Sequence, residues 1–252
     1  MSEILLKSEN LARSFGGLQA VAGVSLSLPA GQVTALVGPN GAGKTTTFNL
    51  ITGNLRADSG TASIRGRPIM GLKPWQVARL GVARSYQDLR LFTHMTVREN
   101  VLAATEVSSW FWQPGGARAR AQRRQRAEAA MEATGLTAVA DARAVDLAYA
   151  ERKFLSMARI LAAEADIWLL DEPASGLDLA SRIRFGTLLK DAQARGVAIC
   201  LIEHNLDVVV ELSNRIAFLD QGKVLAEGDP DTILKDPALA AIYFGDRPQE
   251  AA

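Results

Sequence analysis

Short apolar runs, each followed by a mixed and helix-like segment, recur along this chain. Apolar runs bounded by turn residues are typical of buried strands, and the longer segments after them fit helices. Such an alternation predicts a mostly parallel sheet with crossover helices. The predicted strand–helix pairs are 33–37 with 45–51, 167–170 with 181–195, and 197–202 with 206–213.

Two regions depart from this alternation. Residues 4–37 carry short apolar runs separated by Gly and Pro turns, which predicts an antiparallel β subdomain. Between about 95 and 165 the pattern is helical, with predicted helices at 96–105, 118–134 and 152–163. We therefore predict a single α/β domain over 1–252, with the parallel-sheet core and β subdomain at about 1–87 and 164–252, and a helical insertion at 88–163.

The composition limits the classes of protein to which this chain can belong. A chain of 252 residues with a net charge of +1 and 48% hydrophobic residues fits one large domain with an ordinary core. No apolar run approaches the roughly 18–20 residues that span a bilayer, and the first ten residues lack a signal-peptide pattern. Cys200 is the only cysteine and lies in an apolar run, which predicts a buried strand residue and no disulfide framework. We expect a cytosolic compartment, and the near-zero net charge gives no reason to expect nucleic acid as a partner.

The most specific motif is a complete phosphate-binding loop of the form G-x-x-x-x-G-K-[ST]. It stands between a predicted strand and a predicted helix, so backbone N–H groups and the helix dipole would point at an anion. The loop therefore predicts binding of a nucleoside triphosphate. Its residues are Gly38, Pro39, Asn40, Gly41, Ala42, Gly43, Lys44 and Thr45, followed by Thr46.

Two further predicted strands end in titratable side chains. Asp171 and Glu172 follow one strand, and His204 follows the next. The carboxyl ends of parallel strands meet at one edge of a sheet, so these side chains should face the phosphates held by Lys44. Asp171 can hold Mg²⁺ together with the hydroxyl of Thr45. Glu172 can act as the general base that activates water, and His204 would reach the γ-phosphate side.

With these motifs the chain resembles the ATP-binding subunits of ABC transporters, and the similarity runs over nearly its whole length. The resemblance implies a P-loop NTPase fold with a RecA-like core, ATP and Mg²⁺ as cofactors, and ATP hydrolysis. Gln87 matches the family's glutamine that senses the γ-phosphate and Mg²⁺, and Phe15 matches an aromatic that stacks on adenine. The turn at 174–178, which ends in Asp178, resembles the loop that crosses to a partner subunit, and His204 matches the family's switch histidine.

The family's signature Leu-Ser-Gly-Gly-Gln corresponds here to Leu147-Ala148-Tyr149-Ala150-Glu151. In the family this segment contacts the γ-phosphate held by the other subunit. One loop and one signature per chain therefore imply a head-to-tail pair of ATPase chains, formed by two copies or with a related chain. Ala150 stands where glycine is usual in the amino-acid branch. Alanine would hinder closure if the position needs a positive φ or close phosphate approach, and would be harmless in a helix.

Residues 89–100 and 242–245 resemble ATPases of importers for branched-chain and other hydrophobic amino acids. That resemblance implies transmembrane permease subunits, a solute-binding protein, and a peripheral location at the cytoplasmic face of the inner membrane. Importers of urea or aromatic acids, an envelope-lipid transporter and a soluble ATPase of the superfamily are the alternatives. The pair Ala148-Tyr149 favours the amino-acid branch.

Two features of the insertion allow two interpretations each. Five arginines within 118–126 predict a helix with a solvated basic face, or contact with anionic lipid head groups. The cluster from Trp110 to Trp112 would cap the insertion's own small core, or dock a transmembrane subunit as an exposed patch.

Overall fold

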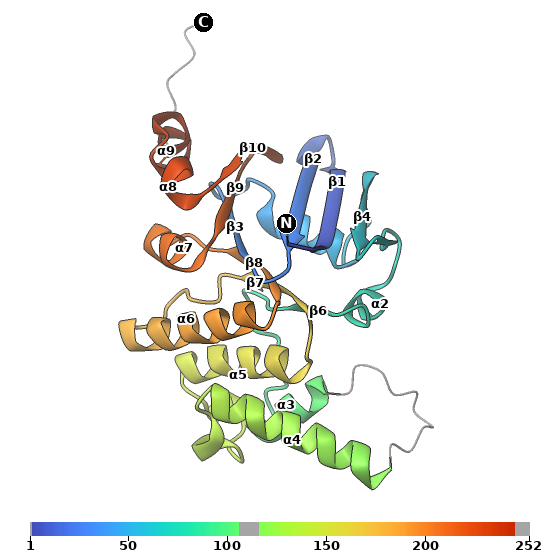
Figure 1. The fold of residues 1–252 in the computed structure, drawn as a ribbon, viewed down its shortest axis with the longest axis vertical. Coiled ribbons are helices and arrows are strands. Elements are labelled where there is room, and N and C mark those ends of the chain that lie inside the picture. Colours follow the sequence, from blue (N-terminus) through green and yellow to red (C-terminus); the bar gives the residue numbers. More distant parts are fainter. Residues whose placement is uncertain (1, 106–115, 245–252) are drawn as a thin grey trace, which may run out of the picture.

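The computed structural model describes residues 2–105 and 116–244. In Figure 1 the two β-sheets occupy the upper part of the view, and the helices α3 to α6 lie beneath them. The cluster from Trp110 to Trp112 lies outside the described residues. Within the described ranges, no helix combines the length and the apolar character needed to cross a bilayer.

A six-stranded sheet forms the centre of the molecule, in the order β10-β9-β3-β8-β7-β6. Neighbouring strands from β9 to β6 are parallel, and only β10 pairs antiparallel to its neighbour, which confirms the predicted parallel core. The strands are β3 (Val33–Val37), β6 (Val82–Arg84), β7 (Ile167–Asp171), β8 (Ala198–Ile202), β9 (Arg215–Asp220) and β10 (Lys223–Gly228).

The N-terminal region forms a second, antiparallel sheet in the order β2-β1-β4-β5. The predicted β subdomain is therefore present, and Figure 1 shows it beside the upper end of the central sheet. Its strands are β1 (Ile4–Phe15), β2 (Leu18–Pro29), β4 (Ser59–Ile64) and β5 (Arg67–Pro68).

The six predicted helices are present with small shifts at their ends, and α2, α8 and α9 are further helices that the sequence pattern did not predict. Thr96 caps α3 by accepting from the N–H of Glu99, whose carboxylate accepts from the N–H of Thr96 in return. The helices are α1 (Lys44–Ile51), α2 (Pro74–Ala78), α3 (Val97–Ala104), α4 (Ala117–Ala133), α5 (Tyr149–Ala162), α6 (Leu179–Ala194), α7 (Leu206–Leu212), α8 (Pro230–Leu234) and α9 (Pro237–Phe244), with 3₁₀ turns at Thr137–Val139 and Ala144–Asp146.

The central sheet is covered on both faces, so its inner strands are mostly apolar. Along β8, Ala198, Cys200 and Ile202 belong to the cluster shared with the β subdomain and α1. Ile199 and Leu201 belong to the cluster shared with the helices α3 to α6. The expectation that Cys200 is a buried strand residue is confirmed, since its side chain has no exposed surface.

Helix α4 is partly free of the core. Its buried residues all lie in its second half, whereas Arg118, Arg120 and Arg124 in the first half are exposed. Arg126 forms an ion pair of 2.9 Å with Glu164. The insertion therefore presents basic side chains to solvent along the first half of this helix.

Candidate functional site

The phosphate loop joins β3 to α1, and its glycines are needed for close backbone contacts. Gly38 has φ +152° and Gly43 has φ +102°. A Cβ on Gly38 would lie 1.8 Å from the carbonyl oxygen of Leu219, and one on Gly43 would lie 2.3 Å from that of Ala20. The chain therefore folds around a loop that only glycine can form at these two positions.

Lys44 begins α1 with its side chain almost fully buried. Its ammonium donates to the carbonyl oxygens of Gly38 at 2.6 Å and Pro39 at 2.8 Å. Burial lowers the pKa of this lysine, and the carboxylates of Glu172 and Asp171 oppose that shift. The start of α1 has no side-chain cap, so its first N–H groups and this cation together suit a phosphate.

Asp171 is the last residue of β7 and is only 3% exposed. Burial raises the pKa of its carboxyl, while Arg84 and the hydroxyl of Thr45 oppose the shift. Its Oδ2 lies 3.8 Å from a guanidinium nitrogen of Arg84, and its Oδ1 has no hydrogen-bond partner among the described residues. A buried, unpartnered carboxylate oxygen beside a hydroxyl is a donor set that fits Mg²⁺.

Glu172 follows Asp171 with φ +49°, a left-handed conformation that costs a non-glycine residue about 1–3 kcal/mol. Its carboxylate lies between two predicted site residues. Oε1 is 2.7 Å from Nε2 of His204, and Oε2 accepts from Nε2 of Gln87 at 3.0 Å. The structure thus brings Gln87, Glu172 and His204 together at the ends of β6, β7 and β8.

Three charged residues that the sequence analysis did not single out hold this arrangement. Lys153 of α5 is 5% exposed and donates to the carbonyl oxygen of Glu172 at 2.6 Å. Arg84 donates to side chains at the end of α1 and lies over the rings of Phe48 and Tyr86. Each stabilises the backbone or side chain of a predicted site residue from outside the phosphate loop.

Glu203, the third of these residues, is 2% exposed and lies directly before His204. Its carboxylate accepts from the N–H of Ala174 at 2.8 Å and from the N–H of His204 at 3.3 Å. Burial raises its pKa, and the two N–H groups and Lys153 oppose that shift. A charged residue next to a motif, at the end of an otherwise apolar strand, is the sequence signal that could have identified it.

The signature segment caps and begins α5. Ala148 is the N-cap, and its N–H donates to the carboxylate of Glu151 at 2.8 Å. Ala150 lies in the first turn and is not among the residues of positive φ, so the helical alternative holds for its backbone. The hydroxyl of Tyr149 lies 3.4 Å from the carbonyl oxygen of Ser175. The signature therefore meets the turn after β7.

Two predicted residues have a visible local role. Asp178 caps α6 by accepting from the N–H of Ser181 at 2.8 Å, and this bond lowers the pKa of its carboxyl. Phe15 ends β1 with its side chain 43% exposed and the guanidinium of Arg13 5.0 Å from its ring centre. An exposed ring of this kind is free to stack on a flat ligand.

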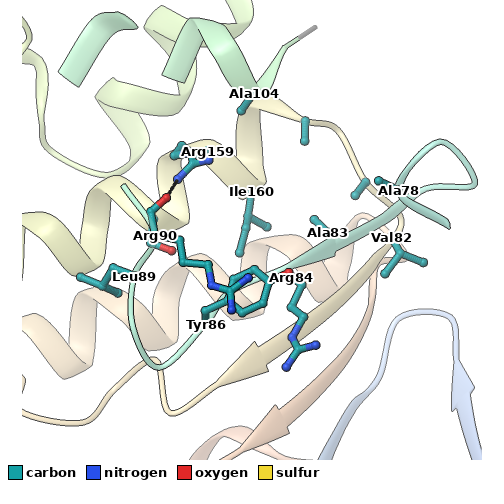
Figure 2. A pocket seen from close by; sticks show the side chains of 13 residues that line it. Ala78, Val82, Ala83, Arg84, Tyr86, Leu89, Arg90, Ala104, Arg159 and Ile160 are labelled. Carbon is teal, nitrogen blue, oxygen red and sulfur yellow. Dashed lines mark hydrogen bonds between the residues drawn. The ribbon is translucent and has the colours of Figure 1, made fainter. Parts of the chain in front are cut away.

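A cavity of about 240 Å³ opens where the core meets the helical insertion. Figure 2 shows Tyr86 and Arg90 on one side of it and Ile160 of α5 on another, with Ala104 of α3 at its edge. Arg159 of α5 donates to the carbonyl oxygen of Arg90 at 2.9 Å and fixes the start of the insertion beside this helix. The segment that carries Gln87 therefore lines a cavity shared with the insertion.

The comparisons with known proteins agree with this geometry. A family model described as "ABC transporter" matches residues 21–175, which is more than half of the chain. The chain belongs to the ABC transporter family. It is an ATP-binding and ATP-hydrolysing subunit of such a transporter, with the fold predicted from its sequence.

Individual relatives show which kinds of ABC transporter protein this chain resembles. The chain is 38% identical to the high-affinity branched-chain amino acid transport ATP-binding protein LivG of Salmonella typhimurium, over 98% of this chain and all of that one. It is 34% identical to the lipopolysaccharide export system ATP-binding protein LptB of Acidithiobacillus ferridurans, over 98% of this chain and 99% of that one. The crystal structure of the ADP conformation of MJ1267, an ATP-binding cassette of an ABC transporter, superimposes with a TM-score of 0.85 at 28% identity, covering 97% of this chain and all of that one.

Proposed function

We propose that this ABC transporter subunit hydrolyses ATP to drive the import of branched-chain or related hydrophobic amino acids through separate membrane subunits. The proposed chemistry rests on the position of the Glu172 carboxylate. Its oxygens lie 2.7 Å from Nε2 of His204 and 3.0 Å from Nε2 of Gln87. The amino-acid class rests on the similarity to the branched-chain transport protein over the whole length of both chains.

The residues around the phosphate loop have separate tasks in this proposal. Lys44 and the loop amides bind the phosphates, and Thr45, Gln87 and Asp171 would hold Mg²⁺. Bound Mg²⁺ would neutralise charge on the transferred phosphoryl group. Phosphate oxygens and water would supply the remaining ligands, because Mg²⁺ usually keeps several waters and takes only one or two protein carboxylates.

Glu172 acts as the general base on the attacking water, and His204 contacts the γ-phosphate. General bases commonly contribute 10²–10⁴-fold to a rate, while positioning and charge stabilisation supply most of the rest for phosphoryl transfer. Phe15 stacks on adenine. The signature residues Ala148, Tyr149, Ala150 and Glu151, together with Asp178, complete the site of a second ATPase chain.

Glu172→Gln tests the chemical part of the proposal. The variant should bind ATP normally but hydrolyse it at least about tenfold more slowly, because an amide cannot accept the proton. Glu211→Gln, which changes an exposed carboxylate on α7, is the matched control and should hydrolyse at the normal rate. Near-normal turnover in Glu172→Gln would remove Glu172 from the role of base.

The solute needs a separate experiment, because the 34% identity to the lipopolysaccharide export protein supports a second candidate, an envelope-lipid transporter. Cells that carry only Glu172→Gln should lose uptake of radiolabelled leucine or isoleucine and keep an intact envelope. Normal uptake together with an envelope defect would favour lipid transport instead.

The proposed location is the cytoplasmic face of the membrane, with a permease subunit seated in the cavity between Tyr86 and Ile160. A segment bound there would touch the stretch that carries Gln87, so dimer closure and permease movement could be coupled. Ala104→Trp, which fills the edge of the cavity, should leave ATP binding unchanged and abolish co-purification with the membrane subunits. Normal assembly of this variant would rule out the cavity as the docking site.

A further inference from the structure

Two residues form hydrogen bonds with the backbone of His204, one with its N–H and one with its carbonyl oxygen. Its N–H donates to the carboxylate of Glu203 at 3.3 Å, and its carbonyl oxygen accepts from the hydroxyl of Tyr243 at 2.6 Å. Tyr243 lies 39 residues further along the chain, in the C-terminal helix α9. This helix thus contacts the edge of the candidate site, although none of the residues assigned to nucleotide binding or hydrolysis lies in it.

The side chain of Tyr243 is partly buried and packs against core residues. Its ring meets the ring of Phe218 in β9 edge to face, with centroids 6.4 Å apart and an interplanar angle of 62°. Burial raises the pKa of its phenol, and the nearby carboxylate of Glu203 shifts it the same way. The hydroxyl therefore stays protonated and keeps its ability to donate to His204.

The imidazole of His204 depends on its backbone for orientation. Its side chain is 40% exposed, so packing alone does not fix it, yet its Nε2 lies 2.7 Å from the carboxylate of Glu172. The next residue, Asn205, accepts from the N–H groups of Asp207 and Val208 and caps α7. The peptide between residues 204 and 205 therefore lies between the cap of α7 and the hydroxyl of Tyr243.

We propose that Tyr243 is a positioning residue for ATP hydrolysis, and that its hydroxyl holds the backbone of His204 so that the imidazole stays against Glu172. The inference rests on the role of His204 in the proposed function. It connects α9 to the hydrolytic site through this one hydrogen bond.

The test compares steady-state hydrolysis by the purified full-length chain and by Tyr243→Phe, which keeps the ring against Phe218 and removes only the hydroxyl. We expect kcat to fall about three- to tenfold, the effect of one ordinary hydrogen bond, while the KM for ATP stays within about twofold. The matched control is Ala238→Ser, at an exposed position of α9, which leaves the packing of the helix and the hydroxyl of Tyr243 in place. It should hydrolyse ATP at close to the normal rate, and an equal loss of kcat in this control would overturn the proposal.

A double-mutant cycle with His204→Ala distinguishes the role of Tyr243 from the role of His204. If Tyr243 acts through His204, adding Tyr243→Phe to His204→Ala should cause no further loss of kcat. Independent, multiplying losses would overturn the positioning role. A normal kcat in His204→Ala would contradict the role of His204 itself, whereas a low kcat in His204→Ala with a normal kcat in Tyr243→Phe would contradict only this inference.

Discussion

Gly38 and Gly41 belong to the same phosphate loop but meet different surroundings. A Cβ on Gly38 would overlap the carbonyl oxygen of Leu219, while one on Gly41 would meet nothing within 4 Å. Both residues have positive φ, at +152° and +82°. The loop therefore allows steric overlap and backbone strain to be measured separately.

We expect Gly38→Ala to lower the free energy of unfolding by about 3–5 kcal/mol, because backbone strain and overpacking add. Gly41→Ala should cost about 1–2 kcal/mol, since only the left-handed conformation is penalised. Urea denaturation followed by circular dichroism measures both values. Equal losses in the two variants would show that the contact with Leu219 is not the deciding constraint.

Motif residues could be predicted individually because their chemistry is local. The loop sequence alone places Lys44 at a helix start, and a strand ending in Asp171 and Glu172 directs both carboxyl groups to one sheet edge. Lys153 could not be found in this way, and Glu203 only through its place beside His204 at the end of an apolar strand. Their importance comes from burial and from contacts with the backbone of distant residues, and a single sequence does not encode such contacts as a spacing.

At the scale of elements, α5 answers the part of the question about Ala150 that concerns its backbone conformation. The helix begins at Tyr149, three residues before the predicted start at 152, so Ala150 belongs to its first turn. The periodicity missed this turn because it lacks a regular apolar stripe, whereas the capping contact of Glu151 with the N–H of Ala148 fixes it in the structure.

Ala150→Gly should therefore lower the free energy of unfolding by about 1 kcal/mol, because glycine is a poorer helix former. The hydrolysis rate should not change, since the backbone needs no positive φ there. Ala121→Gly, in the exposed first half of α4, is the control for the cost in stability alone. A clear rise in hydrolysis by Ala150→Gly would show that this position needs glycine for contact with the nucleotide.

At the scale of the whole molecule, our proposal assigns the phosphate loop and the signature of one chain to two different ATP sites. A single chain therefore completes neither site. We expect Glu172→Gln to change from monomer to dimer on addition of Mg²⁺ and ATP, because α5 keeps its first N–H groups available with alanine at position 150. Light scattering measures the mass with and without nucleotide. Lys44→Ala combined with Glu172→Gln should stay monomeric, and a Glu172→Gln monomer that binds ATP without dimerising would point to a different ATPase chain as partner.

The architecture as a whole was predictable because its pattern is repeated: apolar strands and helices alternate, and one helical stretch interrupts them. The order of the strands was not predictable, because apolar runs such as 33–37 and 197–202 do not indicate which strands pair with them. Which strands pair depends on how the crossover helices cover the two faces of the sheet.

The strand order also determines when the site can exist during synthesis. Among the described strands, β3, which carries the phosphate loop, pairs only with β8 and β9, and these begin at Ala198 and Arg215, late in the chain. A growing chain that ends before β8 has a phosphate loop on a strand with no neighbour in the sheet. The antiparallel sheet of β1, β2 and β4, by contrast, needs only the first quarter of the chain. ATP is therefore not expected to stabilise a chain that ends before β8, and nucleotide binding reports that the central strands have assembled.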